Sequence, residues 1–306
     1  MRLDPAVQTY VERVLAAPQV WEVALGEARR GVDAETDELF GPADQVEVED
    51  LVIAGSVRVR VYRPDGDGPR PAVIYLHGGG WVVGSIESHD PVCRAIATRT
   101  PALVVSVDYR LAPEHPFPAG LEDAWAAAEW VAAHRADLGA DRVAVAGDSS
   151  GGNLAAVVAL RARDRGVELA QQVLIYPVID CDLDSPGYAA YGVGTNLTRA
   201  KMEWYWAQYV GDGDGAHPEA SPLRAADLAG VAPALIITAE YDPLCHEAEQ
   251  YANRLAAAGV PVELYGYDRQ IHGFVRMAAL TPDAGRALDQ IASTLRGMTA
   301  TTRSAE

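Results

Sequence analysis

The chain opens with helical periodicity and then changes to a strict alternation of apolar and polar residues. Residues 4–17 begin with Asp before Pro, a helix-start signal, and a second helix is predicted over 20–30. The alternation follows at 46–48 and 57–61, with Ala54-Gly55 between the two runs. This pattern predicts an antiparallel hairpin of two half-buried strands.

From residue 72 onward, short apolar runs alternate with helical patterns. The runs predict buried strands at 72–76, 103–107, 143–146, 173–176, 234–238 and 262–265. Helices are predicted at about 91–100, 121–136, 150–163, 244–258 and 283–295. Such alternation is typical of a mostly parallel sheet with helices on both faces. Together with the hairpin, it predicts an α/β fold with an eight-stranded sheet.

One long segment interrupts this rhythm. Residues 177–233 exceed an ordinary connection and contain a predicted helix at 199–210 between two turn-rich stretches. We expect residues from about 180 to 220, with those from about 1 to 45, to form a helical cap on a single domain spanning 1–306. Several aromatic residues would either line an apolar pocket or pack the cap onto the sheet: Trp81, Trp204, Tyr205, Trp206 and Tyr209.

Charge and composition exclude several classes of function. Acidic residues outnumber basic ones by 43 to 25, and the formal net charge is -18. This balance argues against nucleic-acid and anionic-membrane partners and mildly disfavours anionic substrates. The only lysine, Lys201, has no phosphate-loop or Schiff-base context, and we expect it on the cap surface. Cys93, Cys181 and Cys245 form no metal-binding or disulfide pattern, and no targeting or membrane-spanning segment is evident, so we expect a cytoplasmic protein.

The strongest chemical signal is the sequence Gly-Asp-Ser-Ser-Gly at 147–151. It matches the G-x-S-x-G nucleophile elbow, in which a sharp strand-to-helix turn exposes a serine hydroxyl. A predicted strand runs into this sequence and a predicted helix runs out of it, which is the context that the motif requires. We therefore predict Ser149 as a nucleophile.

The second signal is the sequence His77-Gly78-Gly79-Gly80, directly after the predicted strand at 72–76. Three consecutive glycines allow backbone N–H groups to approach a tetrahedral intermediate closely. We predict that the N–H groups of Gly79, Gly80 and Ser150 form an oxyanion hole. His77 is expected to support this loop rather than to carry protons.

A serine nucleophile needs a histidine base, and three histidines follow Ser149. His217 falls in the expected cap, and His246 falls in the first turn of a helix. His272 follows the last predicted strand, at the carboxyl edge of the sheet, and we predict it as the base.

The base in turn needs an acid that orients it. Asp242 follows the predicted strand at 234–238 and lies at the same edge of the sheet, so we favour it. Glu240 and Asp180 are the competitors, and Asp268 is too close to His272 in sequence to be favoured.

Five motifs, in order along nearly the whole chain, resemble those of the bacterial hormone-sensitive-lipase-like carboxylesterases, the family IV esterases. They are HGGGWVVG at 77–84, SVDYRLAPEHPFPA at 106–119, GDSSGGNLAA at 147–156, YDPL at 241–244 and IHGF at 271–274. The resemblance implies an α/β-hydrolase fold with a helical cap, and hydrolysis of short- to medium-chain carboxylic esters without metal or cofactor. It also suggests a homodimer and implies the same triad and oxyanion residues.

Two positions depart from the family pattern. Ser150 stands where relatives often have Ala, and Cys245-His246-Glu247 stands where Arg-Asp-Glu is common. Neither changes the predicted reaction: a serine carboxylesterase acting on a small-molecule ester. An alternative hypothesis is an amidase or deacetylase, which would use the same site. A third hypothesis is a non-catalytic small-molecule receptor. The presence of His272 speaks against the receptor, because such family members lack the catalytic histidine.

Overall fold

The computed structural model describes residues 1–66, 68 and 70–300. Within these residues one sheet has the strand order β1-β2-β4-β3-β5-β6-β7-β8. The strands are β1 (Glu47–Ile53), β2 (Val57–Arg63), β3 (Arg70–Leu76), β4 (Leu103–Asp108), β5 (Ala140–Asp148), β6 (Gln171–Ile175), β7 (Ala234–Tyr241) and β8 (Val262–Ile271). β2 pairs antiparallel with β1 and with β4, and the other neighbours pair parallel. The predicted α/β class and mostly parallel eight-stranded sheet are confirmed.

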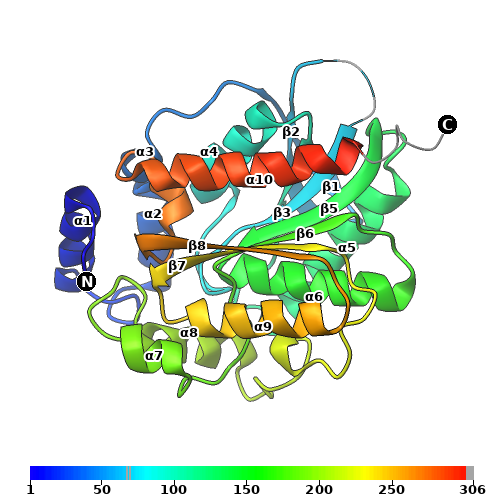
Figure 1. Ribbon diagram of the computed structural model, residues 1–306. Helices are drawn as coiled ribbons and strands as arrows, with labels where there is room; N and C mark the ends of the chain where they lie inside the picture. The colour runs from blue at the N-terminus through cyan, green and yellow to red at the C-terminus, as the bar shows by residue number, and fades with distance from the viewer. Residues whose placement is uncertain (67, 69, 301–306) are drawn as a thin grey trace.

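Helices cover both faces of the sheet (Figure 1). One face carries α4 (Ile86–Arg99) and α10 (Pro282–Ala300), and the other carries α5 (Ala119–Ala133), α6 (Ser150–Arg165) and α9 (Cys245–Ala257). Alternate residues of the strands face opposite layers. In β3, for example, Ile74 packs in the core beneath α5 and α6, and Val73 packs in the core beneath α4 and α10. The unbroken apolar runs of the sequence therefore reflect burial on both faces.

The N-terminal segment differs from its prediction in one helix. α1 (Pro5–Ala16) lies where expected, but the helix predicted over 20–30 is wrong in its bounds. The Gln19 N–H donates to the Glu22 carboxylate, and the Glu22 N–H donates to the Gln19 carbonyl, which closes a turn there. The helix α2 (Leu25–Ala34) begins only after this turn, and a short helix α3 (Thr36–Phe40) follows.

The long segment after β6 also contains one helix that was not predicted. α7 (Pro186–Tyr191) begins within the first turn-rich stretch, with proline at its first position. The predicted helix at 199–210 is α8 (Arg199–Val210). The remaining 3-10 turns are η1 (Pro222–Arg224) and η2 (Phe274–Arg276).

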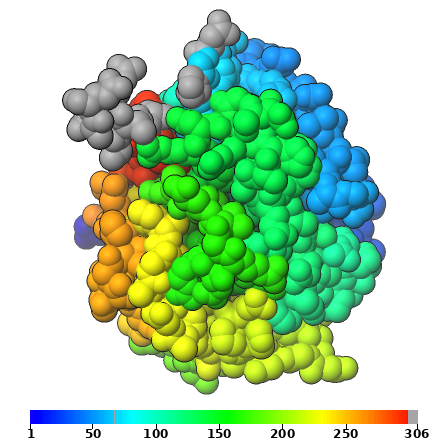
Figure 2. Space-filling model, turned by 90° about the vertical axis from the view of Figure 1, so that its right-hand side faces the viewer, coloured from blue at the N-terminus to red at the C-terminus, as the bar shows by residue number. Residues whose placement is uncertain are grey.

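The N-terminal helices and the segment with α7 and α8 lie at the side of the molecule toward which the strands β7 and β8 point (Figure 1). Figure 2 looks at the opposite end, and the dark-blue N-terminal residues appear there only at the rim. The carboxyl ends of the parallel strands are thus adjacent to both segments that we expect to form the cap. In the described part of the chain, every helix is too short or too polar to cross a membrane.

Candidate active site

Ser149 occupies a strained turn between β5 and α6. Its φ of 56° and ψ of -119° lie in a region that residues with side chains rarely adopt. The flanking glycines make this turn feasible. A Cβ atom at Gly151 would lie 1.9 Å from the carbonyl oxygen of Leu76, and one at Gly147 would lie 2.3 Å from the carbonyl oxygen of Gly151. The sequence thus folds locally into the expected nucleophile elbow.

The structure brings together the three residues predicted as a triad. His272 Nε2 lies 2.8 Å from Ser149 Oγ, and His272 Nδ1 lies 2.7 Å from Asp242 Oδ2. Asp242 is fully buried, and its Oδ1 accepts a hydrogen bond from the Leu244 N–H at 2.9 Å. Asp242 and His272 follow the neighbouring strands β7 and β8, where Tyr241 is paired with Ile271. The carboxylate therefore holds Nδ1 as the donor and leaves Nε2 to accept the serine proton.

The glycine loop after β3 lies beside this serine. Gly79 and Gly80 have φ values of 126° and 58°, and a Cβ at Gly79 would lie 2.1 Å from the Val83 carbonyl oxygen. Among the described residues, nothing accepts a hydrogen bond from the N–H of Gly79, Gly80 or Ser150. Three backbone donors thus have no acceptor: two belong to residues that line the cavity beside Ser149, and the third belongs to the residue after Ser149, which is the kind of donor set that an oxyanion requires.

A buried network supports the loop from behind. Asp148 Oδ1 accepts hydrogen bonds from the Tyr75 hydroxyl at 2.9 Å and the Gly78 N–H at 3.0 Å, and its Oδ2 lies 3.2 Å from His89 Nε2. Burial alone would raise the pKa of Asp148, but His89, Arg276 and these hydrogen bonds outweigh it, so the pKa falls below its ordinary value. The carboxylate stays charged and fixes the start of the glycine loop.

His77 also acts as a support. Its buried ring stacks on Tyr109 with a centroid separation of 4.3 Å, and the Tyr109 hydroxyl donates to the His77 carbonyl at 2.7 Å. Burial lowers the pKa of His77 to about 3, so the ring is neutral and not a proton carrier near neutral pH.

The serine opens into a cavity of about 150 Å³. Its walls come from the glycine loop, the residues around His272 and both expected cap segments, and they include Tyr10, Val32, Leu39, Asn196, Leu197, Tyr205, Arg276 and Met277. The Asn196 side chain donates to the His272 carbonyl at 2.8 Å, and the Lys201 ammonium donates to the Asn196 carbonyl at 2.8 Å. The expectation that Lys201 lies on the surface is wrong: it is half-buried, and burial lowers its pKa.

The predicted aromatic pocket is largely wrong. Of the five aromatic residues named for it, only Tyr205 lines the cavity. Trp81 is 1% exposed and its ring stacks on that of Tyr209, with a centroid separation of 4.1 Å and an interplanar angle of 4°. The ring centroid of Trp206 lies 4.8 Å from that of Trp81. These rings pack α8 onto the residues after the glycine loop, which was the other reading of the sequence. Trp204 packs against Tyr205 outside the cavity lining.

The competing acids and bases are engaged elsewhere. The Glu240 carboxylate accepts the Arg269 N–H at 2.6 Å, and Asp180 pairs with Arg224. His217 Nδ1 accepts the Glu219 N–H at 3.2 Å, and His246 lies 3.0 Å from Gln250 on α9. Asn196 and Arg276 could not be predicted as site residues, because neither belongs to a recognisable motif.

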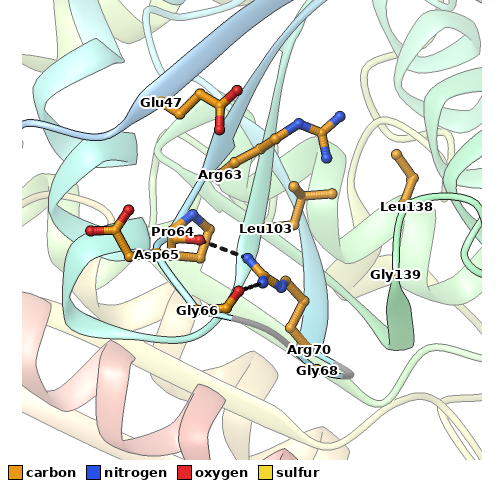
Figure 3. Close-up of a pocket in the computed structure, with 10 residues that line it drawn as sticks. All are labelled: Glu47, Arg63, Pro64, Asp65, Gly66, Gly68, Arg70, Leu103, Leu138 and Gly139. Atoms are coloured by element: carbon orange, nitrogen blue, oxygen red, sulfur yellow. Dashed lines mark hydrogen bonds between the residues drawn. The ribbon is translucent and has the colours of Figure 1, made fainter.

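A second cavity, of about 360 Å³, lies at the opposite end of the parallel strands (Figure 3). Arg70 donates there to the carbonyl oxygens of Pro64 and Gly66, and Arg63 reaches toward the same space. Its described lining contains no serine, cysteine or histidine, so it offers no serine or cysteine nucleophile paired with a histidine base. In the described chain, no cluster of three His, Cys, Asp or Glu residues is arranged to hold a metal ion.

Comparisons with known proteins show what this chain is similar to. A family described as alpha/beta hydrolase fold matches residues 73–276. The chain is 42% identical to the carboxylic ester hydrolase LipN of Mycobacterium tuberculosis, over 88% of this chain and 75% of that protein. It is 36% identical to the ethyl acetate hydrolase of Pseudomonas putida, over 97% of this chain and 99% of that protein. The solved structure of the hyperthermophilic esterase from Pyrobaculum calidifontis superposes with a TM-score of 0.90 at 43% identity, covering 98% and 99%.

Proposed function

Since the chain belongs to the α/β-hydrolase family, within its hormone-sensitive-lipase-like carboxylesterases, and is a carboxylic ester hydrolase, we propose that Ser149, His272 and Asp242 carry out this hydrolysis through an acyl-enzyme. The observation that carries the proposal is the continuous hydrogen-bonded chain from Ser149 Oγ through His272 to Asp242, beside three unengaged N–H groups. No cofactor enters the proposed reaction.

In the first half of the reaction, Ser149 Oγ attacks the ester carbonyl carbon while His272 Nε2 takes the serine proton. The carbonyl oxygen becomes an oxyanion held by the N–H groups of Gly79, Gly80 and Ser150. Asp242 stabilises the imidazolium. The intermediate then collapses, the bond from carbon to the alcohol oxygen breaks, and His272 protonates the leaving alcohol.

In the second half, water takes the place of the alcohol. His272 removes a proton from this water, the hydroxide attacks the acyl carbon, and the same N–H groups hold the second oxyanion. Collapse breaks the bond to Ser149 Oγ, which recovers its proton from His272 and leaves the carboxylic acid. The water enters from the cavity onto which Ser149 opens.

The cavity volume supports short- to medium-chain substrates. At about 150 Å³ it is smaller than the roughly 300–1,000 Å³ of pockets that enclose drug-sized ligands. We assign its walls at Tyr10, Leu39, Asn196 and Tyr205 to a cap made of residues from about 1 to 45 and about 180 to 220 on a single domain. Such a cap limits the acyl length, and long-chain esters should turn over much more slowly than butyrate esters.

The test combines one variant with three substrates. Ser149→Ala should lower kcat/KM for 4-nitrophenyl butyrate by roughly 10⁴-fold or more, because no nucleophile remains. The matched 4-nitrobutyranilide distinguishes the alternative, an amidase or deacetylase, and 4-nitrophenyl palmitate tests the length limit. Labelling of wild-type protein, but not of the variant, by a fluorophosphonate distinguishes an enzyme from a receptor. A variant that keeps most of its activity refutes the assignment of the nucleophile.

A homodimer and a cytoplasmic location also belong to this proposal. β8 is an edge strand of ten residues, and its exposed apolar side chains Leu264 and Tyr265 supply a surface on which a second copy could pair. Sedimentation of the wild type and of Leu264→Arg tests the dimer, which the variant should weaken. Cys93, Cys181 and Cys245 are free thiols, which supports a reducing compartment.

A further inference from the structure

One cationic side chain in the cavity has no role in the reaction proposed above. Arg276 ends the 3-10 turn η2, four residues after His272, and it lines the same cavity as Ser149 and His272. Its Nε is buried and has no hydrogen-bond partner among the residues that the structure describes. In the described part of the chain, no carboxylate lies within 4.0 Å of its guanidinium.

An unpaired guanidinium beside a cavity is unusual in a chain with 43 acidic residues. The buried Arg161, for comparison, is paired with both Glu122 and Glu219. Removing a cation from water is costly unless an anion or several acceptors replace the water. The charge of Asp148 interacts with Arg276, but in the described chain no acceptor reaches Nε, so a ligand can supply the acceptor that the protein does not.

The protein itself offers no anion in this cavity that is free to take that place. Among the described residues of the lining, Asp148 is the only acidic one, and both of its oxygens are engaged by Tyr75, Gly78 and His89. The remaining walls near Arg276 include the apolar residues Leu39 and Met277. A charge-assisted hydrogen bond formed between such walls is stronger than one formed in open water.

We propose that Arg276 binds a carboxylate of the substrate, so that the preferred substrates are esters that carry a free carboxylate on the acyl or the alcohol part. The proposal rests on the ester hydrolysis proposed above and names the substrate class of the same site. The planar guanidinium matches a carboxylate with two parallel hydrogen bonds. The net charge of -18 does not prevent this contact, because exposed charges farther than about 8 Å are largely screened at physiological ionic strength.

The experiment compares isosteric anionic and neutral esters. On the alcohol side the pair is 4-acetoxybenzoate and 4-acetoxybenzamide, and on the acyl side it is the 4-nitrophenyl monoester of glutaric acid and of its monoamide. In Arg276→Met, the ratio of kcat/KM for the anionic over the neutral ester should fall about 10- to 100-fold in at least one pair. Arg276→Lys, which keeps the charge but loses the paired donors, should fall between wild type and Arg276→Met.

The control variant is Arg286→Met, which removes the same charge from an exposed site on α10. It should leave both ratios at the wild-type value. The proposal is wrong if Arg276→Met changes the anionic and neutral rates by the same factor in both pairs, since Arg276 would then act only through the protein, for instance through its charge near Asp148.

A binding measurement separates this proposal from the proposed reaction. Calorimetry with the two anionic esters is run on Ser149→Ala and on Ser149→Ala with Arg276→Met, so that no turnover is needed. The second substitution should weaken binding of at least one anionic ester about 10- to 100-fold. Equal affinities would overturn the role of Arg276 even if the enzyme hydrolyses esters. A loss of affinity would uphold that role even if the triad assignment failed.

Discussion

Replacing Asp242 by Asn removes one charge from the proposed triad and keeps the shape of the side chain. In the wild type, Oδ1 accepts the Leu244 N–H at 2.9 Å, and Oδ2 faces His272 Nδ1 at 2.7 Å. An asparagine has only one oxygen for these two positions. If that oxygen stays with Leu244, its NH₂ group faces His272 Nδ1.

The size of the effect follows from the tautomer of His272. An NH₂ group donates to Nδ1, so the ring proton moves to Nε2, which can then no longer take the proton of Ser149. If the amide were flipped, its NH₂ group would face the Leu244 N–H, and two buried donors would lie opposite each other at a cost of about 1–3 kcal/mol. The wrong tautomer therefore dominates. Losing the correct base and the stabilised imidazolium together should lower kcat about 10⁴-fold, or about 5 kcal/mol in activation free energy.

The assay is the release of 4-nitrophenolate from 4-nitrophenyl butyrate, with thermal unfolding measured to show that the variant is folded. The matched control is Glu240→Gln, because Glu240 lies near the end of β7, two residues before Asp242, but accepts the N–H of Arg269 instead of contacting His272. It should keep the wild-type rate within about two-fold, as surface changes usually do. If Asp242→Asn retains a tenth of the activity, or if Glu240→Gln loses as much as Asp242→Asn, the orienting acid is wrongly assigned.

Three further predictions address the oxyanion loop, the residue that holds the His272 carbonyl, and the buried carboxyl group of Glu247. Gly80→Ala places a Cβ 2.4 Å from the Tyr205 ring and should lower kcat by about 100-fold or more by moving the loop, as measured with the same ester. Asn196→Leu removes the hydrogen bond to the His272 carbonyl and should lower kcat about 2- to 10-fold, with a smaller change in KM. Glu247→Gln should be more stable than the wild type by an amount that grows as pH rises, and the free energy of unfolding in urea from pH 4 to 8 measures this gap.

The sign of the last prediction follows from burial, which raises the pKa of Glu247 well above its ordinary value. The folded protein keeps a proton that the unfolded chain releases above about pH 4.5, so stability falls as pH rises from there to the folded-state pKa. Glutamine has no such loss, and the gap should widen by about 1.4 kcal/mol per pH unit in that window. A gap that is constant with pH would contradict the buried, protonated state. A wild-type kcat in Gly80→Ala would contradict the role of the oxyanion loop. An effect of Asn196→Leu on KM alone would contradict the role of Asn196 in holding His272.

The sheet and the candidate triad could be predicted from sequence because each depends on local signals that agree. The apolar runs mark the strands, and parallel strands place the residues that follow them at one edge. Asp242 and His272 each come directly after such a run, so their meeting with Ser149 required only the strand order. The helix predicted over 20–30 failed because a turn between Gln19 and Glu22 delays its start, and polar side-chain competition of this kind leaves the periodicity intact.

The role of the aromatic residues of α8 could not be predicted from the sequence pattern. A helix with aromatic residues on several faces can line a pocket or pack onto the sheet, and its composition is the same in both cases. Trp81 decides the outcome: it has a φ of 60° and its ring lies flat on Tyr209, so the stack buries both. Lys201 was misplaced for a related reason, because its ammonium binds a carbonyl oxygen, and backbone acceptors have no signature in sequence.

Arg276 shows that an acidic protein can place a cation in its active-site cavity, so the net charge of the chain does not describe the site. Other arginines of the fold are neutralised close by: Arg269 by Asp4, and Arg286 by Asp283. Among the residues that the structure describes, no equivalent partner reaches Arg276, and that depends on where the fold directs the neighbouring carboxylates, not on how many acids the chain has. The expectation that an acidic chain disfavours anionic substrates averages over the whole surface, whereas recognition depends on charges within a Debye length of the ligand. We therefore expect the unpaired guanidinium in the cavity of Ser149 to outweigh the overall charge balance in substrate choice, and the isosteric ester pairs test this expectation.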